Sequence, residues 1–245
     1  MPDGMPPMDE PMAADARTTT LAERLMADVV DHIRLNSLEP GGVLPSEAEF
    51  ATRAGVSRTV AREGFRGLAA LKLIDVSNGR RARVAQTDDS VLSLIIDHSV
   101  HTKQVSIQQI LDVRRTIELR TAALAALRRT DREAGDIVEL SVAMRENVGN
   151  ADREMEIDIA FHEAIGKACR NPLFTLLVGS FRVVTRQTWP IGWASRLKDD
   201  SRLASIDCHA EIAAAIRERN SLAAEKAMAE HFDSTVKTLL SAGVV

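Results

Sequence analysis

From about Asp89 onward, the sequence consists of long amphipathic helical patterns joined by short connections, and strand signals disappear. The patterns cover residues 106–129, 131–148, 151–171, 171–189, 205–220 and 221–242. Five or six such helices can bury their apolar faces only against one another. We therefore expect a mainly α fold, with an antiparallel all-helical bundle over residues 87–245.

The chain before residue 87 has a different order of elements. Apolar residues at steps of four predict an amphipathic helix over residues 20–36. Ser46, with Glu49 three residues later, forms a capping-box pattern that begins a short second helix, and Gly55 is a typical helix end.

A third helix is expected to begin after Ser57 as its N-cap and to run to about Leu71. Its expected buried residues are Ala61, Phe65 and Leu68. Residues 73–86 then predict two short strands joined by an Asn-Gly turn. Three helices followed by a hairpin are typical of a winged helix-turn-helix, which we assign to residues 17–86.

Composition limits the classes that remain. No apolar run approaches the roughly 18 residues that a membrane span needs, so no membrane partner is expected. Residues 1–16 are acidic and rich in Pro and Met, unlike a signal peptide, which predicts a disordered leader on a cytoplasmic protein. Cys169 and Cys208 are too few for a disulfide framework and are expected to be buried thiols.

Basic residues concentrate in the predicted winged helix, although the formal net charge of the chain is −4. Arg58, Arg62 and Arg66 are spaced four apart and therefore share one face of the third helix. Such a face, beside the small polar Thr59, suits the major groove of DNA. A solvated charged face is the alternative, but the helix order and the caps favour DNA binding.

The hairpin tip carries Arg80 and Arg81, which could enter the adjacent minor groove. The stretch LPSEAEFATRAGVSRTVAREGFRGLAALKLIDVSNGRRARV resembles the DNA-binding domain of GntR-type bacterial regulators, and the resemblance covers about residues 20–84. It implies DNA contacts from Ser57, Arg58, Thr59, Arg62, Asn78, Gly79 and Arg80. Relatives often carry Arg where this sequence has Ala48, which removes a possible contact from the second helix.

Four polar residues interrupt the apolar stripes of three helices in the bundle. Asp158 and His162 lie one turn apart in MEIDIAFHEAI, while His209 and His231 belong to two later helices. A divalent cation satisfies one buried carboxylate and three neutral imidazoles together. Each residue alone could be a satisfied core residue, but the set favours a metal site. Three imidazoles and one carboxylate suit zinc, nickel, manganese or iron, and the softness of the donors does not choose among these metals. Zinc is the ion we expect first.

The bundle resembles the FCD ligand-binding domain of the FadR subfamily, over about residues 91–240. In its metal-containing branch an Asp-x-x-x-His pair joins two later histidines, which implies the same four ligands here. The stretch LDVRRTIE resembles the family's Glu-x-Arg helix, with Asp112 replacing the usual Glu, and Arg114 as the effector-carboxylate anchor. Trp189 resembles a pocket position of sugar-acid-responsive relatives, although an ordinary aromatic remains an equal alternative. Asn171 is expected to be a helix terminus.

These patterns together predict a transcription regulator, acting as a repressor. A homodimer would place two recognition helices on a pseudo-palindromic double-stranded operator. A small carboxylate effector, an organic acid or a sugar acid, would bind the metal and Arg114. One alternative is a metal-dependent hydrolase or lyase with a DNA-tethering domain, although its candidate base, Glu163, faces away from the His162 stripe. The other is a non-specific architectural DNA binder.

Overall fold

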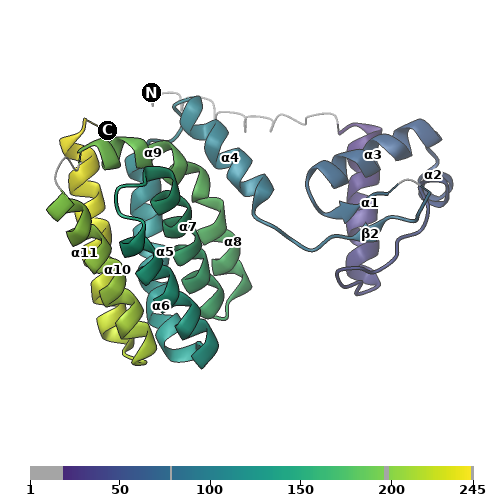
Figure 1. The fold of residues 1–245 in the computed structure, drawn as a ribbon. Coiled ribbons are helices and arrows are strands. Elements are labelled where there is room, and N and C mark those ends of the chain that lie inside the picture. The colour runs from purple at the N-terminus through teal and green to yellow at the C-terminus, as the bar shows by residue number, and fades with distance from the viewer. Residues whose placement is uncertain (1–18, 78, 196–198, 244–245) are drawn as a thin grey trace, which may run out of the picture. The chain divides into compact units, whose positions relative to one another are not determined.

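The computed structural model describes residues 19–77, 79–195 and 199–243, and it divides into the units Met1–Thr87 and Asp88–Val245. The expected leader, residues 1–16, lies outside the described residues. The mainly α fold class is confirmed (Figure 1). None of the helices in the described part of the chain is long and apolar enough to cross a membrane.

The first unit contains α1 (Leu21–Leu35), α2 (Glu47–Ala54), α3 (Arg58–Ala70), β1 (Ile74–Asp75) and β2 (Arg83–Val84). The expected capping box is present, because the Ser46 hydroxyl accepts from the Glu49 N–H while the Glu49 carboxylate accepts from the Ser46 N–H. Gly55 ends α2 with a φ of 65°, a left-handed conformation that glycine adopts at little cost.

The wing of this unit is a small antiparallel hairpin in which Ile74 pairs with Val84. Val43 adds a bridge to Arg83 that the sequence pattern did not predict. The hairpin and the three helices share one core, which contains Leu25, Val29, Leu44, Phe50, Ala61, Phe65, Leu68 and Ile74. This core fixes the exposed face of α3 relative to the wing.

The second unit is a helical bundle. Its helices are α4 (Ser90–His101), α5 (Ile107–Arg128), α6 (Asp131–Glu146), α7 (Ala151–Ala168), α8 (Pro172–Ser180), α9 (Arg182–Ser195), α10 (Asp199–Arg217) and α11 (Ser221–Ser241). The expectation of five or six helices was too low for two reasons. The expected patterns begin at residue 106 and therefore omit α4, and the pattern over residues 171–189 divides at Phe181 into α8 and α9.

The bundle core lies between α5, α6, α7, α10 and α11. Its largest fully buried side chains include Phe161, Ile212, Met228 and Phe232. The helices α5 and α11 pack closely against each other, and α10 packs against α11 and α6. The polar residues singled out from the sequence therefore lie inside a well-packed apolar interior.

Candidate metal and effector site

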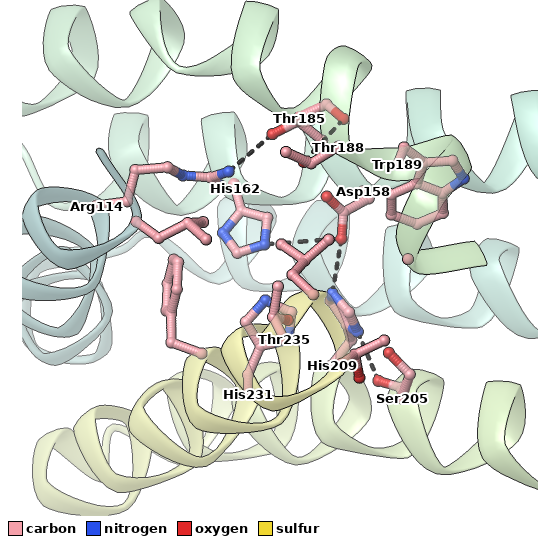
Figure 2. Close-up of a pocket in the computed structure, with 15 residues that line it drawn as sticks. Arg114, Asp158, His162, Thr185, Thr188, Trp189, Ser205, His209, His231 and Thr235 are labelled. Carbon is pink, nitrogen blue, oxygen red and sulfur yellow. Dashed lines mark hydrogen bonds and ion pairs between the residues drawn. The ribbon is translucent and has the colours of Figure 1, made fainter. Parts of the chain in front are cut away.

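The four expected ligands converge inside the bundle. Asp158 and His162 project from α7, His209 from α10 and His231 from α11 (Figure 2). All four are buried, and one potential ligand atom from each lies within 4.8 Å of the others. The polar side chains that interrupt the apolar faces of three separate helices thus form a single cluster.

Apolar packing holds the rings of this cluster in place. Phe161, which is fully buried, makes edge-on contacts with the neighbouring rings of His162 and His209. The ring centroids of His209 and His231 are 4.5 Å apart. The cluster is therefore held by close-packed walls, in which side chains have little freedom to turn away.

The hydrogen bond of His209 defines its tautomer. Its Nδ1 lies 2.8 Å from the carbonyl oxygen of Ser205, which can only accept, so Nδ1 carries the proton. In the neutral ring, Nε2 is then a lone-pair acceptor, and it lies 2.9 Å from Oδ1 of Asp158, a second acceptor. Two acceptors at this distance require a shared cation or proton between them.

His162 has a similar arrangement. Its Nδ1 is hydrogen-bonded to the buried carboxylate of Glu118 on α5. Its Nε2 lies 3.8 Å from Oδ1 of Asp158 and is buried with no hydrogen-bond partner among the described residues. A buried imidazole that donates one N–H to a carboxylate and leaves the other nitrogen unpartnered is typical of a metal ligand.

Electrostatics favour an ionised Asp158 and a neutral His231, whereas His162 behaves differently: burial lowers the pKa of its imidazole, but the carboxylates of Glu118 and Asp158 raise it above its ordinary value. Burial raises the pKa of the Asp158 carboxyl, but the neighbouring imidazoles of His162 and His209 outweigh it, so the net pKa is well below the usual range. Burial lowers the pKa of His231, and His209 and His162 lower it further, which keeps this imidazole neutral. An ionised carboxylate and neutral imidazoles are the forms that bind metals, so a metal ion at this cluster would displace the proton that the two carboxylates favour on His162.

The spacing also fits one ion. Bonds of about 2.0–2.2 Å to a common ion hold its ligand atoms at most about 4.4 Å apart. The observed limit of 4.8 Å therefore needs only a small contraction of the cluster. Together with the unpartnered nitrogen of His162, this spacing makes the donor set suitable for a divalent cation.

A cavity adjoins the cluster and is lined by Arg114, Thr185, Thr188 and Trp189 among others. It offers about 50 Å³ to the centres of water-sized groups, enough for a small ligand or several waters. The expected effector residues Arg114 and Trp189 thus both lie at the same cavity as the four clustered ligands (Figure 2).

Arg114 is buried and well supported. Its Nε donates to Oε1 of Glu118 at 2.9 Å, and its Nη1 donates to the hydroxyl of Thr185 at 2.8 Å. Burial raises the pKa of Glu118, but Arg114 and His162 lower it more strongly, so Glu118 stays ionised. Asp112 is exposed on α5, and the carboxylate that pairs with Arg114 is Glu118.

Glu118 therefore links the two parts of the site, although its role was not expected from the sequence. One oxygen holds Arg114 and the other holds His162. The available signal was its position one turn after Arg114, on the buried side of the same helix. Glu163, the candidate base of the enzyme alternative, pairs with Arg182 and Lys167 and does not line the cavity.

The expected DNA-binding residues lie on an exposed surface of the first unit. Arg58, Thr59 and Arg62 are exposed on α3, and neither arginine forms an ion pair with a described residue. The Ser57 hydroxyl caps α3 by accepting from the Val60 N–H at 3.2 Å. Gly79, with a φ of 73°, and Arg80 lie at the exposed wing tip. Asn78 lies outside the described residues.

The neighbouring basic residues are partly engaged by the protein itself. Arg81 forms an ion pair with Glu49 at 3.6 Å, and Arg83 donates to the carbonyl of Gly41. Ala48 is half-buried on α2 and lines a groove with Arg80 and Arg81.

Asn171 is the N-cap of α8, as expected, since its side chain accepts from the Leu173 N–H. Both cysteines are free thiols; Cys169 is buried, whereas Cys208 is only half-buried.

A winged helix-turn-helix joined to a helical domain with an internal polar cavity defines a ligand-responsive DNA-binding regulator. The model of the gntR family of bacterial regulatory proteins matches residues 21–84, and the FCD domain model matches residues 109–234. The chain belongs to the GntR family of bacterial transcription regulators and carries an FCD domain.

Individual relatives agree with this assignment. The chain is 28% identical over 232 residues to the galactonate operon transcriptional repressor of Escherichia coli strain K12, covering 91% of this chain and 98% of the relative. It is 30% identical over 217 residues to the HTH-type transcriptional regulator LutR of Bacillus subtilis strain 168, covering 85% and 96%. Among solved structures, Streptococcus agalactiae GntR aligns with a TM-score of 0.63 and 26% identity, covering 88% of this chain and 99% of that one. These relatives are transcription regulators and not enzymes, so the hydrolase or lyase alternative loses its support.

Proposed function

We propose that this regulator holds a divalent metal ion through Asp158, His162, His209 and His231, with zinc preferred over nickel, manganese or iron. The observation that carries the proposal is the buried convergence of their ligand atoms within 4.8 Å. Two contacts support it: Nε2 of His162 is buried without a partner, and Nε2 of His209 faces Oδ1 of Asp158, a second acceptor. A bound cation would give the buried nitrogen a partner and remove the repulsion between the two acceptors. When bound, the metal would supply a positive charge and coordination positions for an acid oxygen.

The effector in this proposal is a small carboxylate, either an organic acid or a sugar acid. Arg114 is preoriented by Glu118 and Thr185, and its Nη2 has no hydrogen-bond partner among the described residues. A guanidinium held in this way at a cavity wall is suited to bind a carboxylate. Trp189 forms part of the same wall, and a relative that regulates a galactonate operon is consistent with a sugar acid.

The DNA contacts are assigned to Ser57, Arg58, Thr59 and Arg62 on α3 and to Asn78, Gly79 and Arg80 at the wing. A cytoplasmic homodimer would present two such surfaces to a pseudo-palindromic operator. The effector then acts as a switch only if it binds the DNA-competent and DNA-incompetent conformations with different affinities. We propose that effector binding releases the repressor from its operator.

A thermal-shift screen tests the ligand assignments. Protein loaded with zinc is heated with hydroxy-acids, sugar acids and dicarboxylates, and an acid that binds the folded state raises the melting temperature. His209→Ala should bind less metal and lose the acid-induced shift. An unchanged acid shift in a metal-free His209→Ala protein would overturn the assignment of the metal as part of the effector site.

A further inference from the structure

A second, smaller cavity adjoins the first and shares one of its walls. Trp189, Ser205 and His209 line both cavities, and the remaining polar residues of the second are Glu154, Trp193 and Arg202. It offers about 20 Å³ to the centres of water-sized groups, which is room for one or two small polar groups. A ligand anchored in the first cavity thus has a second compartment beyond Trp189.

Two hydrogen-bond donors in this compartment lack acceptors. Nε1 of Trp189 and Nε1 of Trp193 are both buried, and neither has a hydrogen-bond partner among the described residues. Figure 2 shows the indole nitrogen of Trp189 on the side of the ring away from Asp158. Buried indole N–H groups usually have a hydrogen-bond partner. Two such groups without an acceptor beside one cavity therefore indicate that a bound ligand supplies the acceptors.

The charges of the compartment narrow the chemistry of that ligand. Glu154 is buried and accepts from the N–H of Gly149 at 2.7 Å. The guanidinium carbon of Arg202 lies 3.8 Å from the ring centroid of Trp193. Because the compartment contains both an acidic and a basic side chain, it lacks the uniformly positive lining that a second carboxylate would favour. A hydroxyl group can accept from the indoles or Arg202 and can donate to Glu154.

We propose that this compartment is a distal subsite for the hydroxyl groups of a sugar acid. The inference rests on the proposed function, because the carboxylate end of the same acid occupies the metal cluster and Arg114. It narrows the effector to acids with a hydroxylated carbon chain, which short hydroxy-acids and unsubstituted longer acids do not match. In this proposal Trp189 lies between the first cavity, which binds the carboxylate, and the distal subsite, and its indole N–H donates to a hydroxyl in the distal subsite.

The test uses probes that differ only in the distal hydroxyls. Zinc-loaded full-length protein is titrated in a calorimeter with D-galactonate, D-gluconate and 2-hydroxyhexanoate, which share a six-carbon chain, the carboxylate and the 2-hydroxyl. We expect at least one hexonate to bind about tenfold or more tightly than 2-hydroxyhexanoate, because a site built for hydroxyls discriminates against analogues that lack them. Equal affinities for all three acids would overturn the proposal of a distal subsite, but they would not contradict binding of the carboxylate at the metal cluster and Arg114.

The variant Trp193→Phe removes the indole N–H that lacks an acceptor and keeps an aromatic ring. We expect it to reduce the preference for the hexonate over 2-hydroxyhexanoate severalfold. Damage to the fold or to the metal cluster would weaken both acids together, so the ratio of the two affinities isolates the distal contacts. An unchanged ratio would overturn the role of Trp193. Failure of every acid to bind the wild-type protein would overturn the proposed function as well.

Discussion

Replacing Glu118 with Gln tests how the site is assembled. The carboxylate has two acceptor oxygens in use, one for Nε–H of Arg114 and one for Nδ1–H of His162. A glutamine offers only one acceptor, and its NH₂ group must face one of these donors. If it faces His162, the imidazole must move its proton to Nε2, the nitrogen that points into the cluster and is needed for the metal.

The expected loss follows from this geometry. Removing a hydrogen-bonded partner of a metal-ligating histidine typically weakens metal binding about 10- to 100-fold. That range corresponds to about 1.4–2.7 kcal/mol of binding free energy. We therefore expect Glu118→Gln to bind zinc 10- to 100-fold more weakly, measured by competition with a chromogenic chelator at pH 7. Circular dichroism verifies that the variant is folded before titration.

The matched control is Glu156→Gln, which removes the same charge from α7. Glu156 is exposed and pairs with Arg186 at 3.1 Å, without contact to the cluster. We expect its zinc affinity to match the wild type. If Glu118→Gln stayed within about threefold of the wild type, or if both variants lost affinity equally, the proposed support of His162 by Glu118 would be wrong.

Three further substitutions give distinct outcomes. Arg62→Ala should weaken operator binding and lower the slope of log affinity against log salt by about 1 if it contacts a phosphate, measured by fluorescence anisotropy; unchanged affinity at every salt concentration would exclude the contact. Ser46→Ala should destabilise the first unit by about 1 kcal/mol in urea unfolding, because it removes the α2 cap. An unchanged unfolding midpoint would show that the cap contributes nothing. Phe161→Ala should lower the unfolding free energy by about 3–5 kcal/mol, since the ring is fully buried. A loss below about 1 kcal/mol would contradict the close packing around the histidine rings.

Local signals predicted the first unit well. The Ser46–Glu49 capping box, the left-handed Gly55 and the N-cap at Ser57 depend on residues within a few positions of one another, so the sequence contains all of their interactions. The buried cluster of Asp158, His162, His209 and His231 was predicted for a different reason. Asp158 and His162 interrupt an apolar stripe. Because buried polar groups need a partner, the stripe alone indicates that such a partner exists, even when it comes from a distant part of the chain.

The features that escaped prediction depend on distant contacts. Glu118 meets His162 across 44 positions of sequence, and a single glutamate on a helix does not reveal such a partner. The helix α4 was not among the expected helices, since its packing surface is supplied by α8 and α9, which come much later in the chain. No proline marks the division between α8 and α9 at Phe181, whereas Pro190 lies inside α9. Proline, which usually ends a helix, therefore did not indicate where this helix pair divides.

Calorimetric titration of the effector with and without DNA measures whether the acid site and the DNA-binding surface are coupled. Zinc-loaded protein is titrated with an acid from the thermal-shift screen, first alone and then bound to an operator selected from random duplexes. Because coupling between two sites is reciprocal, an acid that releases the repressor must bind more weakly when the operator is present. We expect a decrease of about fivefold or more in acid affinity, the lower end of typical coupling. Identical affinities with and without operator would contradict the proposal that the acid controls DNA binding.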